Sequence, residues 1–83
     1  MNNTIINILD IDGKKLEVEV ITLIEIDLKK YIVYTKNEKQ KNGNLIIYIN
    51  RLRIKDGVYS IENIESDEEW KKVKSTLGKI ANK

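Results

Sequence analysis

Neither cysteine nor histidine occurs among the 83 residues of this chain. Without cysteine, disulfides and thiolate metal sites are impossible, so a reducing cytoplasm is the expected location. The loss of both residue types removes the commonest general base, the commonest nucleophile and the usual zinc ligands. Glycines number only 4 and never cluster, so no phosphate-binding loop is predicted. We therefore predict a protein that is not an enzyme and needs no metal or cofactor.

Long apolar runs are also missing from the sequence. No run approaches the roughly 20 residues that span a bilayer. The first residues, MNNTIINILDIDG, lack the basic and apolar regions of a signal peptide. We expect a cytosolic protein without membrane contact, formed by a single small domain over residues 1–83, because shorter units lack an adequate core.

Charge is unevenly distributed, although the net charge is only +2. Residues 1–28 carry two lysines and six acidic side chains, whereas residues 29–57 carry eight basic and two acidic ones. Domains that bind nucleic acid usually have a higher basic charge in total, with clustered lysine and arginine. The basic middle third is a candidate surface, but the total charge does not identify a nucleic-acid-binding protein.

Apolar and β-branched segments separated by turn residues predict about five strands. Asp-Gly pairs at 12–13 and 56–57 supply the positive φ angles of tight hairpin turns. The polar segment 36–44 is predicted to be an exposed loop. The predicted strands cover residues 4–9, 16–28, 31–35, 45–54 and 58–61.

The second predicted strand has the clearest pattern, because apolar and acidic residues alternate along it. A period of two predicts one buried and one solvent-facing side. Ile21 and Leu23 fall on the solvent-facing side, so either part of that side is covered or the strand is interrupted nearby. The residues predicted to share the buried side are Leu16, Val18, Val20, Thr22, Ile24, Ile26 and Leu28.

The stretch IESDEEWKKVKSTL, residues 64–77, carries the signature of a helix start. Ser66 and Glu69 have the spacing of a capping box, in which each side chain bonds to the backbone amide of the other residue. We predict an amphipathic helix from Ser66 to about Asn82. The alternative is that Asp67, Glu68 and Glu69 form an acidic patch that binds a partner or a metal.

An apolar stripe follows this helix start, and it must be buried somewhere. The natural place is the apolar face of the sheet, where the tryptophan is the largest group available. The stripe consists of Trp70, Val73, Leu77 and Ile80.

Several segments of the chain belong together as a pattern: ILDIDGKKLEVEVI, YIVYT, NLIIYINRLRI and IENIESDEEWKKVKSTL. They resemble the YrzB-like family of small bacterial proteins, a domain of unknown function numbered 1292. The resemblance runs from about Ile5 to Leu77 and is most specific in the Glu-Ser-Asp-Glu-Glu-Trp run. It implies the fold and a bacterial, cytoplasmic setting. It transfers no catalytic or binding residues to this sequence.

Two binding functions remain open. Tyrosines of the predicted strands lie in or near the basic middle third, and aromatic side chains beside a basic groove are typical of sheets that bind single strands. However, Arg51 and Arg53 share one side of a strand and can pair with Glu17, Glu19 or Glu25 of a neighbour. The preferred hypothesis is a protein-binding or regulatory module whose partner is an unidentified protein or a second copy. The alternative is single-stranded nucleic acid, RNA in particular, bound through residues 29–57.

The predicted fold is α+β: an antiparallel β-sheet of about five strands in meander order, with one C-terminal amphipathic helix packed on one face. The candidate binding surface consists of Lys36, Lys39, Lys41, Arg51, Arg53, Tyr31, Ile21 and Leu23. The predicted core consists of Ile6, Ile8, Val18, Val20, Ile24, Val33, Ile46, Tyr48, Leu52, Trp70, Val73 and Leu77.

Overall fold

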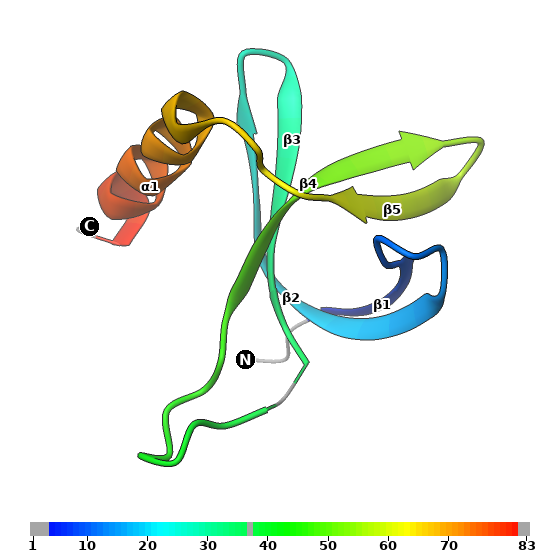
Figure 1. Ribbon diagram of the computed structural model, residues 1–83, viewed down its shortest axis with the longest axis horizontal. Helices are drawn as coiled ribbons and strands as arrows, with labels where there is room; N and C mark the ends of the chain where they lie inside the picture. Colours follow the sequence, from blue (N-terminus) through cyan, green and yellow to red (C-terminus); the bar gives the residue numbers. More distant parts are fainter. Residues whose placement is uncertain (1–3, 37, 82–83) are drawn as a thin grey trace.

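The computed structural model describes residues 4–36 and 38–81 (Figure 1). Five strands precede one helix, which confirms the predicted α+β class. The second strand ends at Ile26, because residues 27 and 28 form a turn, and the fourth begins at Tyr48, later than predicted. The elements are β1 (Thr4–Leu9), β2 (Lys15–Ile26), β3 (Lys29–Thr35), β4 (Tyr48–Lys55), β5 (Val58–Glu62) and α1 (Asp67–Ala81).

The five strands form one sheet that closes into a small barrel in the order β1-β2-β3-β4-β5. Consecutive strands pair antiparallel, which confirms the predicted meander. A parallel contact between Leu9 of β1 and Ser60 of β5 joins the two edges of the sheet. Helix α1 lies outside this barrel (Figure 1). Closure therefore depends on a contact between residues that are far apart in the sequence.

A β-bulge in β2 decides which side chains face the barrel. The register with β3 shifts after Val20 and skips Ile21, so the alternation of faces reverses beyond this point. Val18 packs inside the barrel, whereas Ile24 packs against α1 and Leu23 takes the inner side. The predicted single buried side for the whole strand is therefore wrong. The strand is not interrupted either: β2 continues from Lys15 to Ile26, and the irregularity is the bulge at Ile21.

Two apolar clusters share the central strand β3, which is buried on both faces from Tyr31 to Thr35. The cluster inside the barrel consists of Ile8, Val18, Ile32, Tyr34, Leu52 and Ile61. The cluster between sheet and helix consists of Ile24, Tyr31, Ile64 and Val73, with Ile26, Ile49, Trp70 and Leu77 at its margin.

The predicted core was correct for its central members and incomplete at β3. The core residues that the prediction missed are Tyr31, Ile32, Tyr34, Ile61 and Ile64. The predicted core residues that are only partly buried are Ile6, Val20, Ile46, Tyr48, Trp70 and Leu77. In a strand buried on both faces, apolar and polar residues do not alternate. The sequence therefore does not show which side chains face the barrel and which face the helix.

The start of helix α1 confirms half of the predicted capping box. The Ser66 hydroxyl accepts a hydrogen bond of 3.3 Å from the amide of Glu69. The predicted return bond is wrong, because the Glu69 carboxylate accepts a hydrogen bond from Tyr31 of β3 instead. The predicted end at Asn82 and the side chain of Ile80 lie outside the described residues. In the described part of the chain, no helix has the length and apolarity required to cross a membrane.

Candidate functional site

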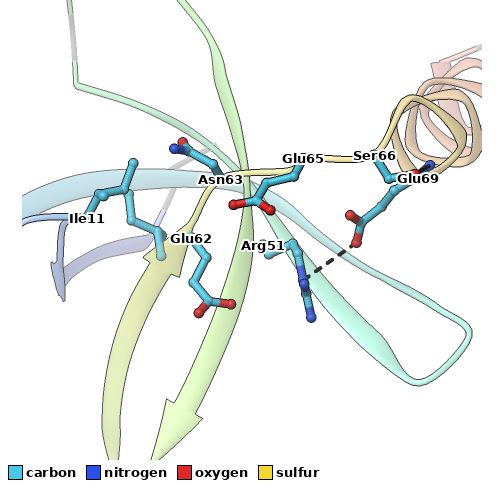
Figure 2. A pocket seen from close by; sticks show the side chains of 8 residues that line it. Ile11, Arg51, Glu62, Asn63, Glu65, Ser66 and Glu69 are labelled. Atoms are coloured by element: carbon cyan, nitrogen blue, oxygen red, sulfur yellow. Dashed lines mark hydrogen bonds and ion pairs between the residues drawn. The ribbon is translucent and has the colours of Figure 1, made fainter.

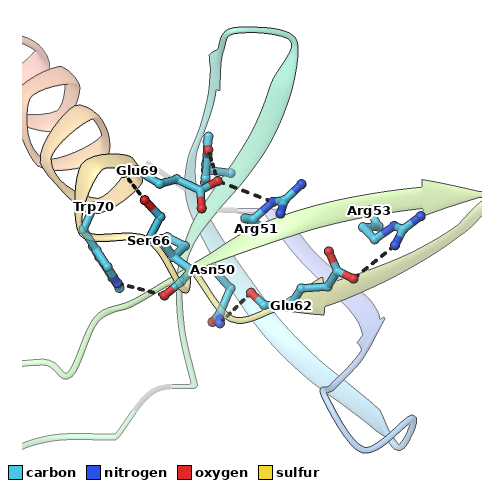
Figure 3. A network of polar contacts seen from close by, with 9 residues as sticks. Asn50, Arg51, Arg53, Glu62, Ser66, Glu69 and Trp70 are labelled. Carbon is cyan, nitrogen blue, oxygen red and sulfur yellow. Dashed lines mark hydrogen bonds and ion pairs between the residues drawn. The ribbon is translucent and has the colours of Figure 1, made fainter.

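A polar network joins α1 to the outer face of the sheet (Figure 3). Glu69 accepts the hydrogen bond of the Tyr31 hydroxyl, and its Oε2 lies 3.5 Å from Nε of Arg51. The indole N–H of Trp70 donates a hydrogen bond of 3.1 Å to the backbone oxygen of Ile64. Since Tyr31 and Arg51 are register partners in β3 and β4, one helical glutamate holds both strands. The network therefore fixes the position of α1.

Two tyrosines of β3 are held as neutral hydrogen-bond donors. Burial and the adjacent Glu69 carboxylate raise the pKa of Tyr31 to about 12. Burial raises the pKa of Tyr34 to about 12 as well, and its hydroxyl donates a hydrogen bond of 2.7 Å to Asn50. Both side chains are 2% exposed, so neither offers a ring on which a base could stack.

A cleft of about 600 Å³ lies between β4 and the connection from β5 to α1 (Figure 2). Two of its carboxylates already have cationic partners: Glu69 contacts Arg51, and Oε2 of Glu62 lies 3.1 Å from Nη1 of Arg53. Over residues 4–36 and 38–81, no group of three or more acidic side chains is placed to hold a metal ion. The cleft is therefore best described as an ion-paired joint between sheet and helix.

An exposed apolar surface lies where two hairpins separate. Pairing between β3 and β4 ends at Lys30 and Leu52, whereas the β2–β3 and β4–β5 hairpins both continue beyond that point. The two hairpin tips therefore point apart, as Figure 1 shows, and we call the surface between them the hairpin fork. It consists of Leu23, Glu25, Leu28, Lys30, Ile54 and Tyr59.

The apolar part of the hairpin fork continues the lining of the barrel. Leu23, Ile54 and Tyr59 extend the rows of β2, β4 and β5 that face the barrel interior. Their side chains are 58%, 46% and 38% exposed, respectively. Single apolar residues are common on protein surfaces, but contiguous ones mark interaction sites. The hairpin fork is therefore the candidate functional site.

Leu28 is the least expected residue of the hairpin fork. It forms the turn between β2 and β3 together with Asp27, has a φ of 69° and is 92% exposed. A left-handed backbone costs residues other than glycine about 1–2 kcal/mol. Gly57, in the turn between β4 and β5, shows the usual solution. Lys72 of α1 donates a hydrogen bond of 2.8 Å to the carboxylate of Asp27 and so holds this turn. Strained conformations that the surrounding structure holds in place are concentrated at functional sites.

The lysines of the predicted site lie at the opposite end of the molecule from the hairpin fork. Lys36, Lys39 and Lys41 follow the C-terminal end of β3, whose seven residues span about 20 Å from Lys29. The ammonium group of Lys36 lies 4.6 Å from the centre of the Tyr48 ring. These lysines are exposed, but the structure does not bring them to the arginines.

The other predicted site residues lie on different surfaces. Arg51 and Arg53 pair with glutamates of α1 and β5, and not with the predicted glutamates of β2. Tyr31 is buried below α1, and Ile21 is the residue skipped at the bulge. Leu23 alone belongs to the hairpin fork.

Most residues of the hairpin fork lie outside the predicted binding surface. Lys30 and Ile54 fall within the segment 29–57 of the RNA alternative, whereas Glu25, Leu28 and Tyr59 do not. One signal was available, since only two residues separate Ile26 from Lys29, which is the length of a tight hairpin loop. The pair Asp27-Leu28 lacks the glycine that marks such loops, so the predicted strand continues through it to Leu28.

The family model that matches residues 12–81 is described as a protein of unknown function (DUF1292). The chain is 33% identical over 69 residues to the UPF0473 protein of Heliobacterium modesticaldum (strain ATCC 51547 / Ice1). That similarity covers 83% of this chain and 75% of the relative. No solved structure matches the chain. The family match spans every residue of the hairpin fork.

Proposed function

The chain belongs to the DUF1292 family of proteins of unknown function, and we propose that it is a non-catalytic, cytosolic protein-binding module. The proposed contact surface is the hairpin fork. One observation carries the proposal: Leu28 is almost fully exposed and adopts a left-handed backbone. A turn that only connected two strands would be more stable with glycine or asparagine there. Burial of a leucine in a partner contributes about 1.5–3 kcal/mol, which is as large as this strain or larger.

Single-stranded nucleic acid, RNA in particular, is the second candidate. A depression at the base of the hairpin fork favours it, because cations line the depression and no carboxylate does in the described part of the chain. These cations are Lys29, Lys30, Arg51 and Arg53. Two observations count against RNA: both arginines already pair with glutamates, and the tyrosines of β3 are buried. Protein binding is therefore preferred.

The test is a pull-down with tagged protein from a lysate of the organism that encodes it, with and without nuclease. Three proteins are compared: the parent, Leu28→Asn, and a control in which Lys36, Lys39 and Lys41 are all changed to serine. Asparagine tolerates positive φ, so Leu28→Asn removes the apolar side chain and keeps the turn. We expect the parent and the control to retain a protein that survives nuclease, and Leu28→Asn to lose it.

The other outcomes are equally informative. A protein retained equally by Leu28→Asn would remove the hairpin fork from the binding surface. Retention that nuclease abolishes would instead favour RNA bound through the basic middle third.

A further inference from the structure

The hairpin fork carries two opposite charges side by side. Glu25 of β2 and Lys30 of β3 are register partners, and both line the same depression of about 340 Å³ together with Leu23, Ile54 and Tyr59. Both side chains are exposed. Within the described residues, neither of them makes an ion pair or a side-chain hydrogen bond. Both charged groups are therefore accessible to another molecule, as an adjacent pair of opposite sign.

We infer that a second copy of this chain occupies the hairpin fork, in a two-fold symmetric contact. The inference rests on the proposed function and names the partner. In such a contact both copies use the same surface patch. Each contact between two different residues therefore occurs twice, once in each direction across the interface. Glu25 of each copy then faces Lys30 of the other across an axis that runs between β2 and β3, and the apolar side chains lie beside these charges.

Self-complementarity is what favours a second copy over other partners. An acidic peptide would satisfy Lys30 and leave Glu25 facing a like charge, and a nucleic acid strand would do the same. A second copy satisfies both charges at once. Leu23, Ile54 and Tyr59 supply apolar surface beside these paired charges, which the contact buries as well.

The charges provide a test that needs no knowledge of any other molecule. Sedimentation velocity from about 10 μM to 1 mM covers the range of small and transient interfaces. The parent is expected to form a dimer as its concentration rises. Glu25→Lys alone and Lys30→Glu alone are each expected to remain monomeric, because each substitution places like charges opposite one another twice.

Two recombination experiments make the result specific. An equimolar mixture of Glu25→Lys and Lys30→Glu protein is expected to form a mixed dimer, since the two variants carry opposite charges at both contacts. The double variant, with both substitutions in one chain, is expected to recover the parent's dimer. Both positions are exposed, so all variants are expected to fold, and the like charges within each single variant lower its stability by no more than about 1 kcal/mol, which thermal melting measures.

The inference is overturned if the parent stays monomeric over this range, or if the single variants dimerise as the parent does. Failure of this inference differs from failure of the proposed function. A monomeric parent that still retains a nuclease-resistant protein through Leu28 would leave the fork as a site for another protein. A monomeric parent that retains nothing through Leu28 would end both proposals.

Discussion

Replacement of Leu28 by glycine is expected to stabilise the free protein while it weakens binding. Left-handed backbone costs leucine about 1–2 kcal/mol, whereas glycine loses only about 0.5–1 kcal/mol more backbone entropy on folding. The side chain is 92% exposed, so its removal leaves no cavity and breaks no core contact. At the middle of these ranges the net effect is a gain of about 0.75 kcal/mol, which raises the Tm by about 3–6 °C in a domain of this size.

Urea unfolding followed by circular dichroism measures this gain as a higher midpoint with an unchanged slope. Ile5→Gly is the matched control, because Ile5 is also well exposed, at 59%, but lies in a regular strand. Glycine there is expected to destabilise the protein. The comparison separates relief of strain from the general effect of glycine.

A lower midpoint for Leu28→Gly would refute the reasoning, because it would mean that Leu28 stabilises the free molecule. Unchanged binding would refute the functional part, since the exposed leucine would then contribute nothing to a partner. A variant that is more stable and binds less tightly cannot owe its loss of binding to unfolding. This combination makes the prediction sharper than truncation of a buried residue.

Two further predictions concern the joint between sheet and helix. Trp70→Ala is expected to cost about 2–4 kcal/mol in the free energy of unfolding, since it removes a half-buried ring whose N–H bonds to Ile64. Thermal melting equal to that of the parent would contradict the packing of α1 on the sheet. Tyr31→Phe is expected to flatten the loss of stability at alkaline pH. The pKa of Tyr31 rises from 10.0 to about 12 on folding, so its contribution is complete below pH 10 and is lost as the pH approaches 12. Urea midpoints that fall equally steeply for parent and variant between these pH values would contradict the buried phenol.

Local signals in the sequence were sufficient for the helix, the strand order and the class of the fold. The cap at Ser66 and the stripe through Val73 depend on neighbours within a few turns, so spacing alone reveals them. Closure of the barrel depends on Leu9 and Ser60, which are distant in the chain. No local pattern marks such a contact, so the sequence predicts the strands without predicting that they close.

The reversal at the bulge could not be located from periodicity, for a physical reason. An extra residue in one strand shifts every later side chain to the other face. In β2 the inner face is buried in the barrel before Ile21, and the outer face is buried against α1 after it. Apolar residues therefore occur on one face before Ile21 and on the other face after it. Ile21 and Leu23 are apolar residues on the predicted solvent-facing side, which indicates an irregularity in the strand. However, the same pattern would arise if that side were covered.

The same bulge shows which exposed residues of the fork need an explanation beyond the fold. After the shift at Ile21, Leu23 lies on the inner face of the sheet. The barrel interior is filled by the cluster around Val18 and Ile32, so Leu23 lies beyond it. Exposure of Leu23 therefore follows from the strand's path. No such constraint acts on Leu28, because a turn position accepts asparagine or glycine at lower free energy. The structure of the free molecule accounts for Leu23 but not for Leu28, so Leu28 is the stronger argument that the hairpin fork binds a partner.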